Sequence, residues 1–374
     1  MIRSYSFLLL LLVLSCSCNS GNEDDMTTLD PSNLVVAIDV ATDGSGLVVV
    51  NANADNTTSY QFFMGDGNPN EPYQNTTGTY EHTYESLGTY TIEVRAYGAS
   101  GRFIKKEQQV AVVTGDSNTV GEGYTSPTSY PNMQLAWNDE FEGTSVNTDN
   151  WYFEIGDGCP NLCGWGNNEL EYYRRENTSV GSGFLTIEAK EEAFGGRNYT
   201  SSRMISKGKQ TARYGRVDIR AILPEGQGIW PALWMLGQNI DAVSWPACGE
   251  IDIMELVGST TGDGNSTIYG TAHWNTPDVN HASEGGNFKL NSGKFSDKFH
   301  VFSIVWTEGN IQWLVDNEPY FSLPITDSNM SEFHQPHFFI FNIAVGGNWP
   351  GNPNDATAFP QQMLVDYIRV FQEN

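Results

Sequence analysis

The sequence predicts an all-β protein built from two β-sandwiches of unequal size. Short runs in which apolar and polar residues alternate recur along most of the chain, and Gly, Asn and Asp turns separate them. This is the pattern of antiparallel strands with one buried face. Long helical periodicity is nearly absent. With 374 residues, the chain is long enough for two domains and short processing segments.

Residues 1–18 predict a lipoprotein signal peptide. Arg3 supplies a positive end, and Phe7 to Leu14 forms an apolar core that is too short to span a bilayer. The run Val13-Leu14-Ser15-Cys16 resembles a bacterial lipobox, although Leu14 is larger than the usual residue. Cys16 would then carry the lipid, with Cys18 as an alternative. We expect an exported outer-membrane or cell-surface lipoprotein; a plain signal peptide and a secreted protein stay open.

Residues 19–32 are polar and predict a tether, and residues 33–113 predict the small sandwich. Phe62-Phe63-Met64-Gly65-Asp66-Gly67 and Gly88-Thr89-Tyr90-Thr91 resemble segments of a PKD domain. Such a domain is either a spacer or an accessory that binds glycan. All ten Trp residues lie after residue 136. The small sandwich therefore lacks the best sugar-stacking side chain, and we favour the spacer. Residues 114–129 are rich in Gly, Ser and Thr and predict a linker.

Residues 130–374 predict the larger sandwich, with two antiparallel sheets packed face to face. The evidence is a series of strand-like runs with turn residues between them. They include residues 184–188, 215–220, 301–306, 311–315, 338–342 and 364–368.

Charge and cysteine content restrict the partners. The chain has 19 Lys and Arg against 45 Asp and Glu, a net charge of −26. This excludes nucleic acid and anionic membrane surfaces as partners, and it favours a neutral ligand over a sulfated polysaccharide.

Beyond the tether, Cys159, Cys163 and Cys248 form at most one disulfide, and Cys159 and Cys163 are close enough in sequence to pair. No matching pair of histidines accompanies them, which argues against a metal site.

The run Gly249-Glu250-Ile251-Asp252-Ile253-Met254-Glu255-Leu256 places three carboxylates among aliphatic residues. In a strand, Glu250 and Asp252 share a face, whereas Glu255 would point to the other. One β-bulge after Asp252 would bring Glu255 back to the shared face. Two carboxyl groups about 5–5.5 Å apart suit a retaining glycosidase, with one as nucleophile and one as acid/base. The alternative is a strand whose acids simply face solvent.

This run resembles the catalytic signature of glycoside hydrolase family 16 in its bulged form, Glu-x-Asp-x-x-Glu. Residues 167–173, 228–236 and 342–351 also resemble family segments and occur in family order. The resemblance covers about residues 131–372, and among family members the laminarinases are the most similar. It implies a β-jelly-roll with an open cleft.

The resemblance also implies roles for individual residues. Glu250 would be the nucleophile and Glu255 the acid/base, with Asp252 between them. Two nearby anions would keep Glu255 protonated. For the tryptophans the alternative role is core packing, for Arg203 a surface salt bridge and for His273 a buried core histidine. The expected substrate-binding residues are Trp230, Trp234, Trp245, Asn167, Glu169, Tyr172, Arg203, His273, Asn342 and Trp349.

The resemblance further implies a structural calcium ion, held by Asp366 with backbone oxygens of Glu142 and Gly183. No cofactor is expected for catalysis. The predicted function is retaining endo-hydrolysis of β-1,3-glucosidic bonds in a neutral laminarin-type glucan by a monomer. Three alternatives stay open: a mixed-linkage β-1,3-1,4-glucanase, a transglycosylase of the same fold, and a surface protein that binds glucan without cleaving it. An intact set of three carboxylates argues against the last.

Overall fold

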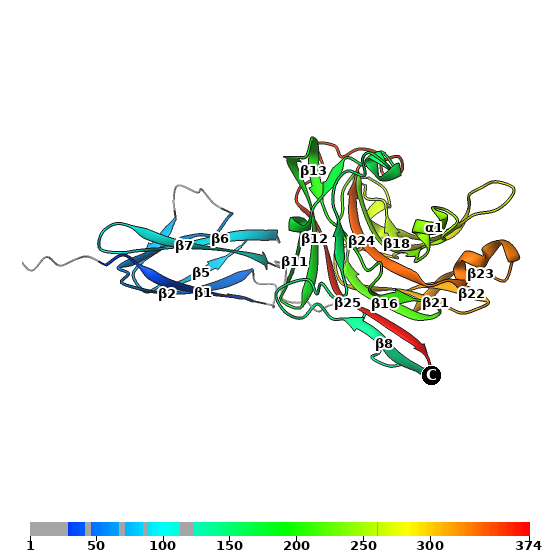
Figure 1. Cartoon of the computed structure of the whole chain (residues 1–374), viewed down its shortest axis with the longest axis horizontal. Coiled ribbons are helices and arrows are strands. Elements are labelled where there is room, and N and C mark those ends of the chain that lie inside the picture. The colour runs from blue at the N-terminus through cyan, green and yellow to red at the C-terminus, as the bar shows by residue number, and fades with distance from the viewer. Residues whose placement is uncertain (1–28, 42–45, 67–71, 85–87, 113–122, 260) are drawn as a thin grey trace, which may run out of the picture.

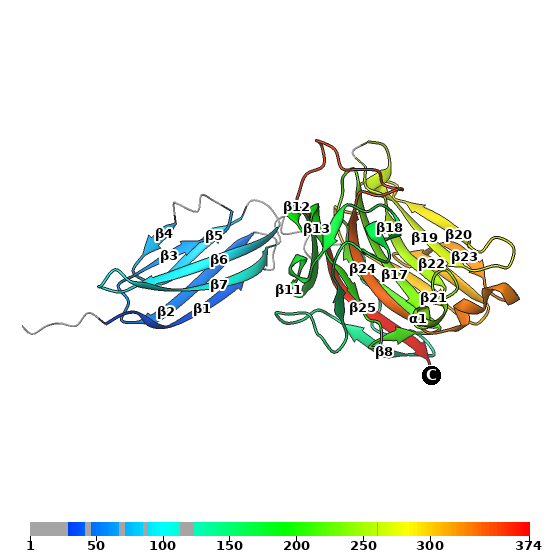
Figure 2. The same ribbon diagram turned by 45° about the horizontal axis from the view of Figure 1, so that its top comes forward.

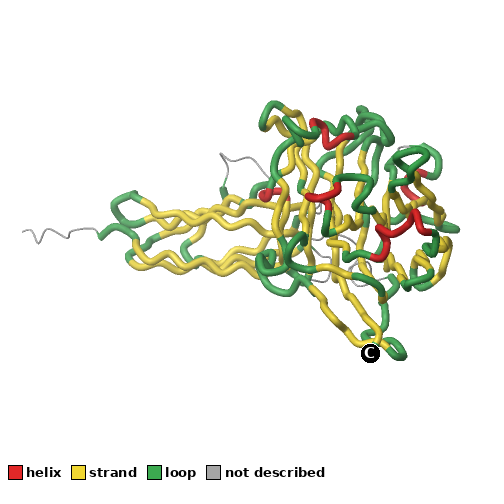
Figure 3. The backbone as a smooth tube through the Cα atoms, turned by 45° about the vertical axis from the view of Figure 1, so that its right-hand side comes forward, coloured by secondary structure: helices red, strands yellow, loops and turns green. Residues whose placement is uncertain are grey.

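The computed structural model describes residues 29–41, 46–66, 72–84, 88–112, 123–259 and 261–374. The expected signal peptide, residues 1–18, lies outside them. Nearly all regular secondary structure of the described chain is β-strand, and loops join the strands, as Figure 3 shows. It forms a small sandwich followed by a larger jelly-roll sandwich (Figure 1), which confirms the predicted fold class. Within the described residues, no helix has the length and apolar character needed to cross a membrane.

The small sandwich packs a three-stranded sheet, β1-β2-β5, against a four-stranded sheet, β4-β3-β6-β7. Alternate residues of β2 are buried, because successive side chains of a strand point to opposite faces. Val48, Val50, Phe62 and Val94 lie at the centre of its core. The strands are β1 (Ser32–Val40), β2 (Leu47–Asp55), β3 (Ser59–Phe63), β4 (Tyr73–Asn75), β5 (Thr79–Thr83), β6 (Gly88–Tyr97) and β7 (Phe103–Val112).

The larger sandwich has a ten-stranded outer sheet with the order β10-β13-β12-β25-β16-β21-β22-β23. Strand β11 pairs with β12, and β8 pairs with β25. The strands are β8 (Met133–Asp139), β10 (Glu171–Tyr173), β11 (Thr178–Gly181), β12 (Phe184–Phe194), β13 (Arg197–Ser201), β16 (Gly215–Ile222), β21 (His300–Trp306), β22 (Asn310–Val315), β23 (Glu318–Pro324) and β25 (Gln361–Glu373).

The second sheet of the larger sandwich has the order β20-β19-β18-β17-β24-β14-β9, with β15 paired to β24. Figure 2 shows β17, β18 and β24 side by side in this sheet. One face packs on the outer sheet around a single large core. The strands are β9 (Tyr152–Glu154), β14 (Arg203–Ile205), β15 (Thr211–Ala212), β17 (Ile229–Gly237), β18 (Glu250–Leu256), β19 (Thr267–Trp274), β20 (Ala282–Lys289) and β24 (His337–Val345).

The helices within the described residues are all short. They are α1 (Ile240–Val243) and the 3-10 turns Cys163–Gly166, Arg175–Asn177, Gly264–Ser266 and Ser328–His334. A disulfide joins Cys159 to Cys163 just before the first of these turns, and Cys248 is free and buried.

The described part of the expected linker contacts the larger sandwich. The backbone nitrogen of Ser126 donates to the Tyr367 hydroxyl at 2.8 Å, and Arg220 Nε donates to the carbonyl of Tyr124 at 2.8 Å. Gly123 forms a parallel bridge with Phe299. The contacts of the larger sandwich therefore begin near residue 123, before the boundary at residue 130 that composition predicts.

Candidate active site

The bulge expected in β18 is present. Leu233 of β17 pairs with Met254, but the next residue, Trp234, pairs with Asp252, so Ile253 is the extra residue. On the other side, the pairing of β18 with β19 also shifts between Asp252 and Glu255. Ile251, Ile253, Met254 and Leu256 all lie in the core. The bulge therefore allows two consecutive apolar residues to face the core while the three acids share the opposite face.

Strand register places the acids in line with residues of distant segments. Directly opposite residues of antiparallel neighbours lie on the same face of a sheet. One row of such residues crosses six adjacent strands from β9 to β19, and we call it the cross-strand row. It consists of Glu154, Arg203, Asn342, Ala232, Glu255 and Tyr269. Ala232 lies in the middle of this row, between Asn342 and Glu255. Because its side chain is smaller than those of its neighbours, the surface of the sheet is lower beside Glu255.

Glu250 lies at one end of the acid group and is held by Trp245. The Trp245 indole donates to Glu250 Oε2 at 3.0 Å. Burial, and then the neighbouring charge of Asp252, raise the pKa of Glu250 to about 8, whereas His273 and the Trp245 hydrogen bond act in the opposite direction. The side chain is 16% exposed, so a reactant can reach it. Glu250 is thus a desolvated carboxylate whose charged form has two specific partners.

Asp252 and Glu255 are more deeply buried, with 3% and 9% exposure. Burial raises the pKa of Asp252 to about 8. Burial and the charge of Asp252 raise the pKa of Glu255 well above its ordinary value. The Trp230 indole donates to Glu255 Oε1 at 3.0 Å. Burial therefore favours the protonated form of Glu255, as it does for Glu250 and Asp252, and a protonated carboxyl group can serve as an acid.

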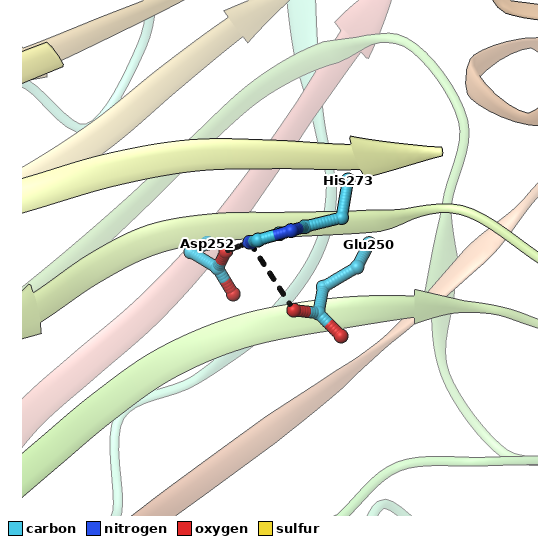
Figure 4. A group of neighbouring side chains, drawn as sticks. All are labelled: Glu250, Asp252 and His273. Atoms are coloured by element: carbon cyan, nitrogen blue, oxygen red, sulfur yellow. Dashed lines mark ion pairs between the residues drawn. The ribbon is translucent and has the colours of Figure 1, made fainter. Parts of the chain in front are cut away.

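His273 comes from β19 and approaches the acids from the side. Figure 4 shows its imidazole between the carboxylates of Asp252 and Glu250. His273 Nε2 lies 3.2 Å from Asp252 Oδ2 and 3.6 Å from Glu250 Oε1. These two contacts follow from register, because β19 pairs His273 with Glu250, and His273 also opposes the rise that burial causes in the pKa of Glu255. The three ligand atoms lie within 4.8 Å of one another and could hold a metal ion.

A second polar group surrounds Arg203, farther along the same face. The Arg203 guanidinium lies between the Trp165 and Trp234 rings, 4.7 and 4.8 Å from their centroids, and its Nε donates to Glu154. Trp234 Nε1 donates to Asn342 Oδ1 at 2.7 Å. The expected salt bridge of Arg203 therefore exists, but it belongs to the cross-strand row and is not an isolated surface pair.

The segment before β10 joins this second group through hydrogen bonds. Asn342 Nδ2 donates to the Tyr173 hydroxyl at 3.1 Å, and that hydroxyl donates to Glu169 Oε2 at 3.0 Å. Asn167 Nδ2 donates to Glu169 Oε1 at 3.0 Å. Glu169 and Asn342 are buried, so they support the face, and their role in binding sugar stays a prediction.

The remaining predicted binding residues are divided between the site and its surroundings. Trp349 is 45% exposed, and its ring meets Trp230 edge to face at 5.6 Å, so it lies beside Glu255. Tyr172 packs its ring on Phe194 at 5.2 Å. No contact of Tyr172 with the carboxylates is present among the described residues, and its role in binding stays a prediction.

Several residues of the site carried no recognisable sequence signal. Glu154 ends a three-residue strand, and His281 lies outside every motif. Tyr173 closes the family-like segment 167–173 but had no expected role of its own. Trp165 lies in the Gly-rich run that precedes Asn167, and its place in that run was the one sequence feature that could have indicated a role in the site.

The residues expected to hold calcium lie away from the carboxylates. Asp366 Oδ2 accepts a hydrogen bond from Arg220 at 2.7 Å, and Glu142 is exposed. Calcium requires several oxygen ligands with negative charge. Because Arg220 pairs with Asp366, a calcium ion bound there would have to share this carboxylate with the guanidinium or displace it. The calcium site stays a prediction, and no catalytic step depends on it.

Fold and site together define a carbohydrate-cleaving enzyme, in which a pair of glutamates on one strand lies among tryptophans on the face of a β-sandwich. Residues 166–369 match the model of glycosyl hydrolases family 16. The match covers more than half of the chain, which therefore belongs to this family and is a glycoside hydrolase.

Relatives and solved structures agree with this family. The chain is 41% identical over 259 residues to a beta-glucanase of Rhodothermus marinus, a match that spans 65% of this chain and 86% of the relative. It is 39% identical to the clotting factor G alpha subunit of Tachypleus tridentatus, but spans only 34% of that protein. The catalytic domain of a Thermotoga petrophila laminarinase is 45% identical with a TM-score of 0.59, covering 65% of this chain and 98% of that domain.

Proposed function

We propose that this glycoside hydrolase is an endo-β-1,3-glucanase that cleaves laminarin-type glucans with retention of anomeric configuration. The observation that supports this most is the different environment of the two glutamates. Burial raises the pKa of both carboxyl groups, that of Glu250 to about 8 and that of Glu255 well above its ordinary value, and Glu250 is the more accessible of the two. A two-step displacement requires one accessible carboxylate that can attack and a second carboxyl group that stays protonated.

In the first step, Glu250 attacks the anomeric carbon and forms a glycosyl ester. The bond from that carbon to the glycosidic oxygen breaks, and the proton of Glu255 moves to the leaving oxygen. In the second step, Glu255 accepts a proton from water as the water oxygen attacks the same carbon. The ester bond breaks, Glu250 leaves as a carboxylate, and Glu255 is again protonated. Two inversions give net retention.

Asp252 controls how the protons are shared. Three acids this close titrate as one coupled group, so a proton held by Asp252 leaves Glu250 charged beside a neutral neighbour. The Trp245 indole and His273 both stabilise the charged form of Glu250. Once the ester has formed, Glu250 carries no charge, so Asp252 can pass that proton to water and ionise without facing a second anion. This assigns Asp252 the role of a proton reservoir for the nucleophile.

The chemistry of the face suits a neutral glucan. Trp245 and Trp349 expose about half of their surface, and pyranose rings present C–H faces that pack on indoles. A net charge of −26 disfavours sulfated polymers. The Thermotoga petrophila laminarinase domain supports the β-1,3 linkage. The Rhodothermus marinus relative, a beta-glucanase by name, keeps mixed-linkage activity as the second candidate.

Export and anchoring are further parts of the proposal. The lipobox-like run at Cys16 supports a lipid-anchored protein on the outer membrane or cell surface, and the small sandwich would then hold the enzyme away from it. We also propose that the enzyme acts as a monomer and that a calcium ion at Asp366 stabilises the larger sandwich.

Substrate choice is tested by incubating the protein with laminarin, lichenan, agarose and κ-carrageenan and separating the products. We expect short oligosaccharides from laminarin, and NMR spectra recorded during hydrolysis should show the β-anomer first. Glu318→Gln, a change at an exposed residue of β23, serves as the matched control. Faster cleavage of lichenan would favour the mixed-linkage alternative, and an initial α-anomer would refute retention.

The two glutamates are distinguished by azide rescue on an aryl glycoside with a good leaving group. Glu255→Ala should recover turnover with azide and yield the β-glycosyl azide, because azide replaces water in the second step. Glu250→Ala should yield the α-glycosyl azide, because azide then replaces the nucleophile. The opposite pattern would reverse the assigned roles.

A further inference from the structure

We propose that His281 is a positioning residue of this enzyme, which acts through His273 and Trp245 on the nucleophile Glu250. The inference rests on the proposed role of Glu250. His281 lies just before β20, in a connection without any recognisable motif, and nothing in the catalytic signature points to it.

The hairpin of β19 and β20 brings His281 to the catalytic face. His273 of β19 pairs with Ser283 of β20. Side chains alternate along a strand, so His281, two residues before Ser283, lies on the same face as His273. Hydrogen bonds within the connection hold its path, from Asn280 N to the Thr276 carbonyl at 2.9 Å and from Val279 N to Thr276 Oγ1 at 3.3 Å.

The two histidines are joined through one ring nitrogen each. His281 Nε2 lies 2.9 Å from His273 Nδ1, and the rings stack with centroids 5.2 Å apart and planes 22° apart. The other nitrogen of His273, Nε2, is the atom that lies between Asp252 and Glu250 (Figure 4). His281 therefore occupies the only nitrogen of His273 that does not face the acids.

This hydrogen bond determines which nitrogen of His273 carries the proton. If His281 Nε2–H donates to His273 Nδ1, the proton of His273 lies on Nε2 and faces the carboxylates. If His273 Nδ1–H donated to His281 instead, a neutral His273 ring would direct the lone pair of its Nε2 at two carboxylates, which is repulsive. The partner of one imidazole nitrogen sets the state of the other. His281 thus keeps a positive N–H dipole directed at Asp252 and the nucleophile.

A second contact extends the effect to Trp245. The His281 ring centroid lies 4.6 Å from that of Trp245, whose indole donates to Glu250 Oε2 at 3.0 Å. Trp245 is 46% exposed, so half of its surface has no protein neighbour to fix it. His273 and Trp245 are the two side chains that approach the oxygens of Glu250, and both contact His281.

Three substitutions separate the hydrogen bond from the ring contact. His281→Phe keeps a ring against Trp245 but removes the donor, His281→Gln keeps an amide donor without the ring, and His281→Ala removes both. Asp278→Asn, an exposed change in the same connection, is the matched control. Thermal unfolding of each variant shows whether the fold is intact.

The kinetic readout uses whichever glucan the wild type cleaves. We expect His281→Phe to lower kcat about three- to tenfold, the effect of one hydrogen bond, with KM changed less than twofold. His281→Gln should recover most of that loss, and His281→Ala should show the largest. Equal kcat in the Phe variant and the wild type would overturn the proposal, and so would a loss that appears only in KM.

The second readout is the ¹⁵N chemical shift of the His273 ring, which needs no substrate. The chain has six histidines, so single substitutions assign each signal. Wild type should show His273 protonated at Nε2 with its Nδ1 signal shifted by the hydrogen bond from His281, and His281→Phe should lose that shift. An unchanged His273 spectrum in that variant would refute the role of His281, whatever the substrate is. Failure to cleave any glucan would instead count against the proposed function.

Discussion

Glu250→Gln should make the protein more stable at neutral and alkaline pH while it abolishes activity. The folded protein raises the pKa of Glu250 from the ordinary 4.5 to about 8, chiefly through burial. A carboxyl group whose pKa is raised by folding favours the folded state when it is protonated. Its contribution is fully present below about pH 4.5 and is lost as the pH rises through about 8.

The size of the effect follows from these two values. One pKa unit corresponds to about 1.36 kcal/mol, so charging Glu250 between pH 4.5 and pH 8 destabilises the fold by up to about 5 kcal/mol. Coupling to Asp252 divides this cost between two groups. We therefore expect the free energy of unfolding of Glu250→Gln to exceed that of the wild type by about 2–4 kcal/mol at pH 8. Gln keeps an oxygen that can accept the Trp245 hydrogen bond.

The assay is chemical denaturation of wild type, Glu250→Gln and the Glu318→Gln control at pH 4.5, 6, 7 and 8. The stability difference between Glu250→Gln and wild type should be near zero at pH 4.5 and should grow with each step. Activity of the variant should fall by at least about a thousandfold, as expected for loss of a nucleophile. Parallel stability curves for the two proteins would refute the claim that burial raises the pKa of Glu250.

Three further predictions use other parts of the molecule. Trp230→Phe removes the hydrogen bond that lowers the pKa of Glu255, so the alkaline limb of kcat/KM should move up by as much as about one pH unit, and an unmoved limb would contradict this contact. Calcium chelation should lower the melting temperature but not activity, Asp366→Ala should remove that shift, and calcium-independent melting of the wild type would rule out the site. A chain that starts at Gly123 should cleave soluble laminarin at nearly the full-length rate, and residues 29–112 alone should show no retardation in a laminarin affinity gel; clear retardation would refute the spacer role.

The sequence predicted local features of the site well. The bulge in β18 was predictable, because side chains of a strand alternate between its two faces and Glu255 lies an odd number of residues after Glu250 and Asp252. One extra residue is needed to put all three acids on the same face. The structure places that residue at Ile253. The structure places the indoles of Trp230 and Trp245 against Glu255 and Glu250, since each lies close to β18 or to its neighbour β17 in the sequence, and their role in binding sugar stays a prediction.

Features that depend on distant pairing were not predictable. Glu154, Arg203 and Asn342 become neighbours only because β9, β14 and β24 pair in one particular register. A shift of one residue in any of these strands would move its side chain to the other face. The contacts of His273 with Asp252 and Glu250 depend on register in the same way, since the pairing of β19 with β18 decides which acids it meets.

The bulge also explains how one strand can serve both the core and the chemistry. In a regular strand, Glu255 would share a face with Ile251 and Ile253, which are buried in the core. A carboxyl group there would lack any polar partner, and its burial would cost several kcal/mol. With the extra residue, Ile253 and Met254 both pack in the core, and Glu255 lies on the opposite face, where the Trp230 indole donates a hydrogen bond to it. The packed core below then fixes the strand, and the strand fixes the spacing of the acids.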